Sequence, residues 1–380
     1  MRTDYKTLGN YIQLVDTRNR DLAVTNLLGV SIEKKFIPSI ANIVGTDLSS
    51  YKVVRTGQFA YGPVTSRNGE KISIAYLDGE DCIISSSYSV FEVTNKEVLD
   101  PEYLMLWFSR PEFDRYARYK SHGSVREIFD WDELCMVELP VPAIEEQKKI
   151  VKAYKTITDR IALKKRINDN LAKILDTIFN NLYQNIDDVN SFTFSELCSL
   201  ASSKRVFAED YTSVGVPFYR GKEITQKRNG EPINDPLYIS VEHYETLKKN
   251  HGVPTFGDIL ITAVGTIGNS YLVQDEDFYF KDGNIIWLKD FLNSGLNYYL
   301  YDYMQTSIFK RELEGICIGS TQTALTIVAL SNLEVKVPDK SVLETYCADS
   351  KVIRNTIQVN NAEIFHLTAV AQSILASLSR

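Results

Sequence analysis

The chain has 380 residues, of which 44% are hydrophobic and 24% are charged, and its formal net charge is −7. This composition excludes a mainly disordered chain, and the acidic balance argues against a generally basic nucleic-acid binder while allowing local basic patches. The chain shows neither an apolar leader nor an apolar run of about 18 residues, which predicts a cytoplasmic protein that contacts no membrane. Five widely spaced cysteines and four histidines without ligand spacing predict neither a disulfide framework nor a metal site.

Residues 1–101 have the pattern of short strands separated by turns. Runs rich in β-branched and aromatic residues, such as 52–55 and 72–76, are each followed by a turn that contains glycine. We therefore expect residues 1–142 to form a β-rich globular domain.

A heptad pattern follows and predicts a long helix over residues 143–185. Its seam positions alternate at intervals of four and three residues, which places them along one stripe of a helix, as in a coiled coil. The stretch contains neither glycine nor proline, and about 40 helical residues span roughly 60 Å. The predicted seam of this helix consists of Ile150, Tyr154, Ile157, Ile161, Lys164, Asn168, Leu171, Leu175, Ile178 and Leu182.

The pattern of strands and turns returns over residues 186–338 and predicts a second β-rich globular domain. Residues 257–262 form one strand-like run, and Asp282-Gly283 is a turn signal. A second heptad then predicts a helix over residues 339–380. Its predicted seam consists of Tyr346, Ser350, Ile353, Ile357, Asn360, Ile364, Leu367, Ala371, Ile374 and Leu378.

The chain contains an internal repeat with an offset of 196 residues. Residues 102–184 match residues 298–380 without a gap, so that Gly123-Ser124 falls on Gly319-Ser320. The repeat covers the region that leads into each helix and the helix itself. The two regions upstream of it are much less similar to each other.

A helix of this length with one narrow apolar stripe needs a partner helix. The polar seam residues Lys164, Asn168 and Asn360 lie near the middle of the two stripes, and such residues set the register of a helix pair. We therefore expect an intramolecular antiparallel coiled coil. The alternative is that each helix packs separately on its own domain.

With this layout the sequence resembles the specificity subunit of type I restriction–modification enzymes. Residues 139–150 are similar to the family's LPxPxxxEQxxI entry into its conserved helix, and residues 257–268 to its GDILI…GTIG stretch. The paired Gly-Ser dipeptides before the two helices are a third similarity. The second junction between proline and helix, residues 337–340, departs from the family because it lacks the Glu-Gln pair.

The resemblance implies an α+β architecture of two target recognition domains joined by two spacer helices. Each domain would read one half of a bipartite site in double-stranded DNA, and the coiled coil would set the gap between the halves. The subunit would bind two modification subunits, which carry the methyltransferase chemistry, and through them two restriction subunits. It would catalyse nothing and bind no cofactor, because S-adenosylmethionine and ATP would be bound by the partner subunits.

In the first domain, two segments have the residue types that contact DNA. The loop 65–71 offers side chains that can bond guanine and adenine edges, although Asn68-Gly69 could also form a plain hairpin turn. Segment 110–126 has a net charge of +3, although such runs are usually solvated helix faces. The expected DNA contacts of the first domain are Ser66, Arg67, Asn68, Arg118, Lys120, Ser124 and Arg126.

In the second domain, segment 202–230 also has a net charge of +3, and an ordinary surface loop is the alternative interpretation. The stretch 265–268 lacks the lysine of a P-loop and the three glycines of a dinucleotide fingerprint, so we expect a tight turn between strands. The expected DNA contacts of the second domain are Lys204, Arg205, Arg220, Lys222, Thr266, Ser320 and Gln322.

Two other interpretations compete with DNA recognition. A coiled-coil scaffold that binds only proteins, without DNA sequence specificity, agrees with the acidic net charge. A methyltransferase would need more than residues 235–238, which lack the second proline of the amino-methyltransferase motif and an accompanying glycine-rich loop. We expect no catalytic residue in this chain.

Overall fold

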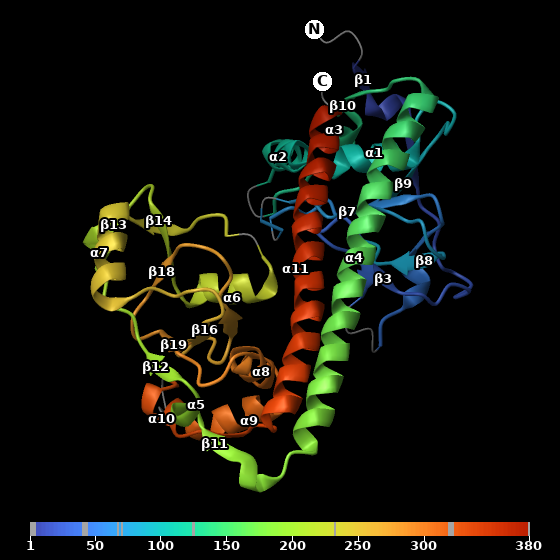
Figure 1. Cartoon of the computed structure of the whole chain (residues 1–380). Helices are drawn as coiled ribbons and strands as arrows, with labels where there is room; N and C mark the ends of the chain where they lie inside the picture. Colours follow the sequence, from blue (N-terminus) through green and yellow to red (C-terminus); the bar gives the residue numbers. More distant parts are fainter. Residues whose placement is uncertain are drawn as a thin grey trace. The chain divides into compact units, whose positions relative to one another are not determined.

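The computed structural model describes residues 5–39, 45–66, 68–69, 71–123, 126–231, 233–317 and 323–378. The chain divides into two compact units, of which unit 1 consists of residues 1–163 and 364–380 and unit 2 of residues 164–363. Each unit therefore contains one β-rich globular region and a part of each long helix (Figure 1). The boundaries expected near residues 142, 185 and 338 stay predictions.

The two long helices are α4 (Ile144–Gln184) and α11 (Lys340–Ser377). In unit 1, Val151 near the start of α4 shares an apolar cluster with Leu378, directly after α11. In unit 2, Phe179 near the end of α4 lies 5.9 Å from the ring of Tyr346 near the start of α11. The helices therefore run antiparallel as an intramolecular coiled coil, as the heptads predict (Figure 1).

The seam of the helix pair departs from the predicted pattern at one position. Ile178 was expected in the seam, but it is 38% exposed, whereas its neighbour Phe179 is 1% exposed. The cause is that this end of α4 also packs on the globular region of unit 2, where the ring of Phe179 lies 5.2 Å from that of Tyr299. The helix therefore turns Phe179 toward both partners and leaves Ile178 in solvent.

The globular region of unit 1 is built around an antiparallel sheet in the order β2–β9–β6–β7. Its strands are β2 (Ile12–Val15), β6 (Phe59–Tyr61), β7 (Ile74–Tyr76) and β9 (Ser89–Val93). Helices α1 (Pro101–Phe108) and α2 (Pro111–Lys120) follow the sheet in the chain. The core forms where Phe59 stacks on Phe91 at 4.9 Å and meets Phe108 edge-on at 6.0 Å.

Among its described residues, unit 1 also has three two-stranded ladders and a short helix. The ladders pair β1 (Tyr5–Thr7) with β10 (Glu138–Pro140), β3 (Leu28–Val30) with β4 (Phe36–Pro38), and β5 (Lys52–Val54) with β8 (Cys82–Ile84). The short helix α3 (Trp131–Cys135) precedes β10. Because β10 leads directly into α4, the first ladder joins β1 to the start of α4.

The described part of unit 2 has two four-stranded sheets and one two-stranded ladder. The first sheet has the order β12 (Ser199–Ala201), β19 (Ile285–Lys289), β16 (Ile259–Thr262), β17 (Ser270–Leu272). The second has the order β13 (Tyr211–Thr212), β15 (Leu237–Ile239), β14 (Val216–Tyr219), β18 (Tyr279–Phe280). The ladder pairs β11 (Ser191–Thr193) with β20 (Glu334–Lys336).

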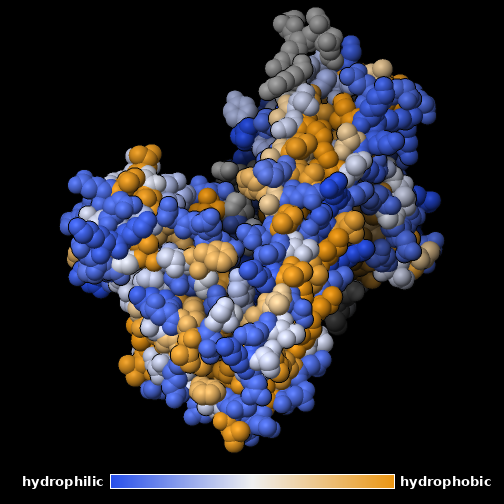
Figure 2. All heavy atoms as spheres, viewed as in Figure 1, coloured by the Kyte–Doolittle hydropathy of each residue, from blue (hydrophilic) through white to orange (hydrophobic). Residues whose placement is uncertain are grey.

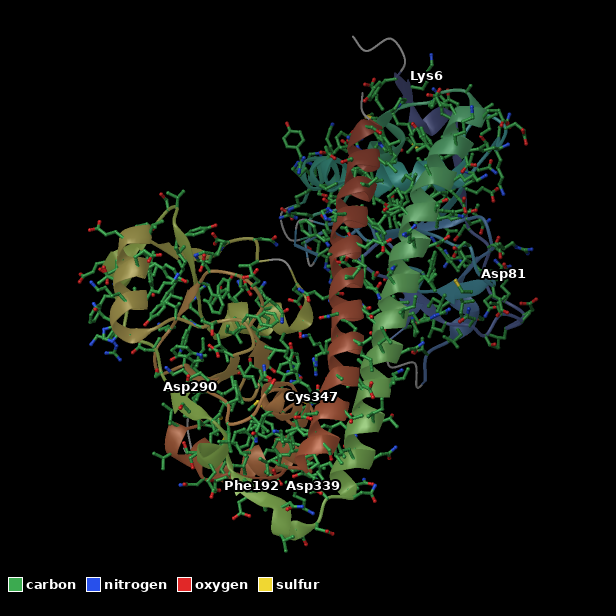
Figure 3. All side chains as sticks on the ribbon, viewed as in Figure 1. Lys6, Asp81, Phe192, Asp290, Asp339 and Cys347 are labelled. Atoms are coloured by element: carbon green, nitrogen blue, oxygen red, sulfur yellow. The ribbon has the colours of Figure 1, made fainter. Side chains whose placement is uncertain are left out.

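The helices of unit 2 connect these strands, and α8 shares an apolar cluster with the start of α11. They are α5 (Phe194–Leu197), α6 (Gly221–Asn229), α7 (Val241–His251), α8 (Leu296–Tyr303), α9 (Ser307–Ile316) and α10 (Ile327–Ser331). Cys347 of α11 is buried, and its thiol donates a hydrogen bond to the carbonyl oxygen of Gly295 at 3.0 Å (Figure 3). Burial raises the pKa of this thiol to about 11, so it belongs to the core.

The two units share the strand order of one sheet, so the structural repeat extends beyond the residues whose sequences match. The order β2–β9–β6–β7 in unit 1 corresponds to β12–β19–β16–β17 in unit 2. Val64 after β6 forms a bridge with Ile128, and Val264 after β16 forms a bridge with Ala324. Ile128 and Ala324 are equivalent positions of the sequence repeat. The loop after β6 and the turn after β16 therefore occupy the same place in the two frames.

Candidate nucleic-acid interface

Three segments of unit 1 that carry predicted DNA contacts meet at one place. The backbone N–H of Thr65, in the loop after β6, donates to the carbonyl oxygen of Glu127 at 3.0 Å, and its hydroxyl donates to Ser121 Oγ at 2.9 Å. Arg118, in the last turn of α2, forms an ion pair with the carboxylate of Glu127. These contacts bring the loop, the end of α2 and residues 121–128 together. We call their described candidate residues the unit-1 patch, which consists of Ser66, Asn68, Arg118, Lys120 and Arg126.

The cations of the unit-1 patch differ in their partners. Arg118 pairs with Glu127, and Lys120 lies 3.2 Å from the carboxylate of Glu133. The hydrogen bond from Lys120 to Glu133 and the attraction between the two charges raise the pKa of the lysine. Arg126 is exposed and has no charged partner within the described part of the chain. Exposed ion pairs contribute at most about 1 kcal/mol, so a phosphate can replace a carboxylate at small cost.

The loop after β6 is longer than the simple hairpin turn considered above, because β6 and β7 are joined by residues 62–73. Inside it, Asn68 donates its backbone N–H to the carbonyl oxygen of Thr65 at 2.9 Å, and its amide donates to that of Val64 at 3.4 Å. The side-chain NH2 of Asn68 is therefore used in a hydrogen bond within the loop. Ser66 of the same loop is exposed.

Gly123 is required by the close approach of two backbone segments. It has φ of +137°, and a Cβ added to it would collide with the carbonyl oxygen of Arg126. This contact shapes the segment that carries Arg126. Two predicted contacts of the first domain, Arg67 and Ser124, lie outside the described residues.

In unit 2 the cationic candidate residues lie beside β18 and β14. Ser203 Oγ donates to the carbonyl oxygen of Phe280 at 2.7 Å, and the backbone N–H of Lys204 donates to the hydroxyl of Tyr279 at 2.8 Å. These contacts hold Lys204 beside β18, which pairs with β14. Because Arg220 directly follows β14, the two cationic segments are neighbours.

The turn at residues 265–268 packs on α6 through one asparagine. The backbone N–H of Asn269 donates to Thr262 Oγ1, and its amide donates to Thr225 Oγ1 of α6, each at 3.0 Å. Gly265 and Gly268 have φ of +77° and +86°, which confirms the predicted tight turn between strands. The turn leaves Thr266 exposed. We call Lys204, Arg205, Arg220, Lys222 and Thr266 the unit-2 patch.

Two cations of the unit-2 patch are paired with carboxylates. The guanidinium of Arg220 donates two hydrogen bonds to Glu223, at 2.6 and 3.1 Å, and Arg205 donates to Asp282 at 2.8 Å. Burial acts to raise the pKa of Glu223, but hydrogen bonds from Arg220 outweigh it and hold the pKa below its ordinary value. Lys222 is exposed, and the described residues include no charged partner for it. The predicted contacts Ser320 and Gln322 lie outside the described residues.

Sequence reasoning missed the residues that assemble these patches. Glu127 is nine residues from its partner Arg118, and Asn269 is 44 residues from Thr225. Neither spacing follows a helical or strand period, so no pattern marks these pairs. The only sequence signal for the location of the patches was the repeat, in which Arg126 and Gln322 are equivalent positions.

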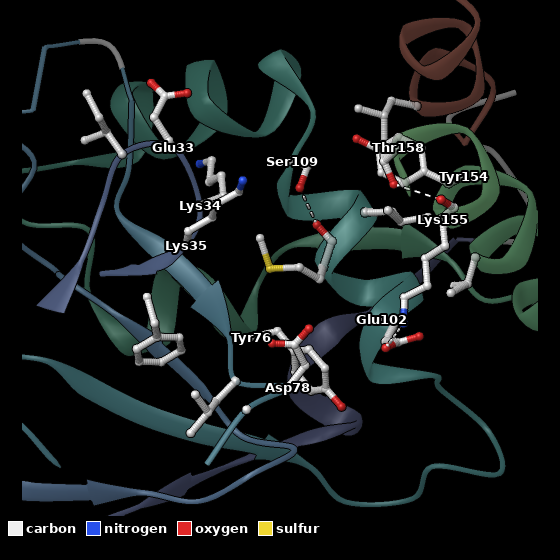
Figure 4. A pocket seen from close by; sticks show the side chains of 18 of the residues that line it. Glu33, Lys34, Lys35, Tyr76, Asp78, Glu102, Ser109, Tyr154, Lys155 and Thr158 are labelled. Carbon is white, nitrogen blue, oxygen red and sulfur yellow. Dashed lines mark hydrogen bonds and ion pairs between the residues drawn. The ribbon is translucent and has the colours of Figure 1, made fainter. Parts of the chain in front are cut away.

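A cavity of about 1240 Å³ lies within unit 1, lined by parts of α1, α4 and the β3–β4 region (Figure 4). Its charged groups are largely paired with each other. Lys34 lies 2.5 Å from Asp114, and Lys155 pairs with Glu102. These ion pairs therefore neutralise four of the charged side chains that line the cavity.

The repeat provides a comparison for two residues of this lining. Leu106 and Thr158 line the cavity, and their equivalents in unit 2 are Asp302 and Arg354. In unit 2, Arg354 pairs with Asp302 and stacks 4.5 Å over the ring of Tyr301. Leucine and threonine cannot form this ion pair in unit 1. We give the cavity no catalytic role.

The chain thus consists of two β-rich regions that share one sheet order, each with its own polar loop cluster, and a pair of antiparallel helices. The model of the type I restriction modification DNA specificity domain matches residues 43–173 and 186–366. The chain therefore belongs to this family and contains its domain twice.

Known proteins with similar sequence or structure agree with this assignment. Over 258 residues the chain is 26% identical to a Haemophilus influenzae protein described as a type I restriction enzyme specificity subunit, covering 66% of this chain and 63% of that protein. It is 24% identical over 166 residues to the HindI specificity subunit of the same organism, covering 43% and 36%. The chain thus spans less than two thirds of the length of these relatives.

The crystal structure of a type I restriction–modification S subunit from M. genitalium has the same fold, with a TM-score of 0.64 and 13% sequence identity. The match covers 99% of this chain and 96% of that one. This likeness concerns the fold alone. Within the part of the chain that the structure describes, no helix is both long and apolar enough to cross a bilayer.

Proposed function

We propose that the chain is the sequence-specific DNA-recognition subunit of a type I restriction–modification enzyme. Each unit would read one half of a bipartite site, and the coiled coil would set the spacing between the halves. The observation that carries this proposal is the shared strand order, which places unlike loops at equivalent positions after β6 and β16. A common frame with different loop chemistry suits a site whose two halves differ in sequence.

The two patches differ in the side chains that can read bases. The unit-1 patch offers Asn68 and Arg126, whose amide and guanidinium groups can bond adenine and guanine edges. The unit-2 patch offers mainly Lys204 and Lys222, which contact phosphate without base selection, and the hydroxyl of Thr266. We therefore propose that unit 1 relies more on direct base contacts than unit 2 does.

Exposed apolar side chains on the long helices support binding to other proteins. Figure 2 shows hydrophobic side chains in a band over these helices. Those on α4 include Leu163, Ile167, Ile174 and Ile178, and those on α11 include Val352, Val359, Phe365 and Val370. Isolated exposed apolar residues are common, but a series along a helix indicates an interface. We propose that this series binds the modification subunits.

The remaining parts of the proposal follow from this arrangement. Leu163 and Ile174 of α4 are exposed, and so are their repeat equivalents Val359 and Val370 of α11. With one such pair on each helix, the chain would bind two modification subunits, and two restriction subunits would join through them. The partners would bind S-adenosylmethionine and ATP, while this chain would bind neither cofactor and catalyse no step. The complex would act on double-stranded DNA in the cytoplasm.

An exchange of one head tests the proposal. Residues 1–142 would be replaced by the corresponding region of another family member, and methylated adenines would be mapped in cells that contain the modification subunit. We expect one half of the methylated site to change while the other half and the spacer stay the same. Cells that lack this chain would serve as the control.

The opposite result identifies the alternative function. If the complex with modification subunits bound all duplexes equally, and the exchange left the methylation pattern unchanged, the chain would be a scaffold that binds only proteins. If the isolated chain transferred methyl groups by itself, it would be an enzyme.

A further inference from the structure

Helix α2 presents a polar face whose most exposed residue belongs to neither patch. Phe113 and Ala117 form its buried side, at 3% and 1% exposure. On the opposite side, Tyr119 is 80% exposed, and the side chains of Arg115 and Arg118 are 68% and 40% exposed. We call Arg115, Arg118 and Tyr119 the α2 face. A tyrosine this exposed adds almost nothing to the core.

The repeat provides a comparison within the same molecule. The equivalents of Phe113 and Ala117 in α9 are Phe309 and Leu313, which are also buried, at 0% and 6%. The buried side of the helix is therefore kept in both units.

The exposed side of the helix differs between the units. The equivalents of Arg115, Arg118 and Tyr119 in α9 are Arg311, Glu314 and Gly315. One arginine is kept, the second is replaced by a carboxylate, and the aromatic ring is absent. Because the core does not require the α2 face, the difference between the units points to a function that unit 1 has and unit 2 lacks.

We propose that the α2 face is a phosphate-binding surface of unit 1, and that it contacts the duplex beside the half-site read by the unit-1 patch. This inference rests on the proposed function. Guanidinium and phenol groups are donors that suit phosphate oxygens, and such contacts fix a protein on DNA without reading its sequence. Arg118 belongs to both surfaces and pairs with Glu127 of the neighbouring loop, so the two surfaces are continuous.

The local electrostatics permit this contact. Arg115 lies 3.4 Å from the carboxylate of Glu112, and both side chains are more than half exposed. Such exposed pairs are weak and screened by salt, so phosphate can replace the carboxylate. The α2 face contains no aliphatic side chain, whereas the cores of protein interfaces are depleted of charge. Duplex DNA therefore fits this face better than a second protein does.

The test uses the full chain assembled with its modification subunits. Binding to the cognate duplex and to an unrelated duplex would be measured over a range of salt concentrations for R115A and Y119F. We expect R115A to weaken binding about tenfold on both duplexes and to lower the salt slope by about 1, as for the loss of one phosphate contact. We expect Y119F to weaken both about fivefold, because the hydroxyl is the donor.

The matched control is R311A, which removes the equivalent arginine of α9. It should leave both affinities and the salt slope unchanged, and equal melting temperatures would show that all variants fold. An unchanged affinity and slope in R115A would overturn the inference, as would an equal loss in R311A. So would a loss confined to the cognate duplex, which would indicate base reading, or a loss of modification-subunit assembly, which would indicate a protein interface.

These outcomes are separate from the failure of the proposed function. If the unmodified complex prefers its cognate duplex while R115A and Y119F bind normally, only the inference about the α2 face is wrong. If the unmodified complex shows no preference among duplexes, the proposed function itself fails.

Discussion

Lys164 Nζ donates a hydrogen bond to the side-chain oxygen of Asn360 at 2.7 Å, and the two residues are 196 positions apart. This separation equals the offset of the sequence repeat, so two equivalent positions contact each other in the middle of the helix pair. Lys164 also lies 2.9 Å from the carboxylate of Glu363, and the amide of Asn360 donates to Asn168 Oδ1 at 2.8 Å. The polar layer therefore marks the register of the antiparallel pair.

The stability of the helix pair should depend on the polar residues of this layer together. Asn360→Leu would remove the amide acceptor of Lys164 and the donor to Asn168, and we expect the free energy of unfolding to fall by about 1–3 kcal/mol. Replacing Lys164 and Asn360 together by leucine should restore it, because a polar seam residue gives register at a cost in stability. Urea denaturation of both variants would measure this. Equal stability of the single and double variants would contradict it.

The length of the helix pair should determine the accepted spacer. Four residues inserted beside Lys164, with four inserted beside Asn360 to keep the helices in register, would lengthen the pair by about 6 Å. This is close to two base-pair steps of about 3.4 Å, so the methylated sites should have a spacer about two base pairs longer. Mapping of methylated adenines would show this. A change in the half-site sequences instead would mean that the helices are not a spacer.

The buried ion pair of unit 2 should tolerate joint replacement better than single replacement. Asp302→Leu would leave the guanidinium of Arg354 without its carboxylate, and we expect a loss of about 3–5 kcal/mol in unfolding free energy. The double variant Asp302→Leu with Arg354→Thr removes both charges. It places at these two positions the residue types of their unit-1 equivalents, Leu106 and Thr158. This double variant should recover only part of the loss, because the hydroxyls of Tyr346 and Ser350, which donate to Asp302 at 2.6 and 2.8 Å, still lose their acceptor. Thermal unfolding would be the measurement, and a double variant no more stable than the single one would refute the explanation.

The low pKa of Glu223 predicts how stability depends on pH. Because the folded protein holds this pKa below the ordinary value of 4.5, the ionised carboxylate stabilises the fold above pH 4.5. That contribution is lost as the pH falls through the folded-state pKa. Glu223→Gln should therefore be less stable than the unmodified chain at neutral pH, and the two should converge in acid. Denaturation curves at several pH values would test this, and parallel curves would count against it.

The ion pair between Arg118 and Glu127 should restrain non-specific DNA binding. Glu127→Gln would release the guanidinium and remove one negative charge, and we expect binding to an unrelated duplex at low salt to tighten about two- to fivefold. Arg126→Ala, which removes an exposed cation of the same patch, should weaken binding instead. Fluorescence anisotropy with the assembled complex would measure both. Weaker binding by E127Q would show that the carboxylate has another role.

The helix pair was predictable because its signal is local. A heptad places residues three and four positions apart on the same stripe, so the pairing face is visible without knowledge of the fold. The centred polar residues Lys164 and Asn360 also indicated the antiparallel register before their contact was known. The equivalence of Arg126 and Gln322 was predictable too, because a sequence repeat is read from the order of residues without knowledge of the fold.

The tertiary structure decided which residues come together at the candidate sites. Thr65 meets Ser121 and Glu127 across more than fifty residues, and this contact depends on a sheet whose strands are distant in the chain. Burial against the core of unit 2 turned Phe179 inward and left Ile178 exposed. The contacts of Thr65 and the burial of Phe179 both depend on packing between elements. In a close-packed core, the whole core sets the partners of a side chain, and its neighbours in sequence do not.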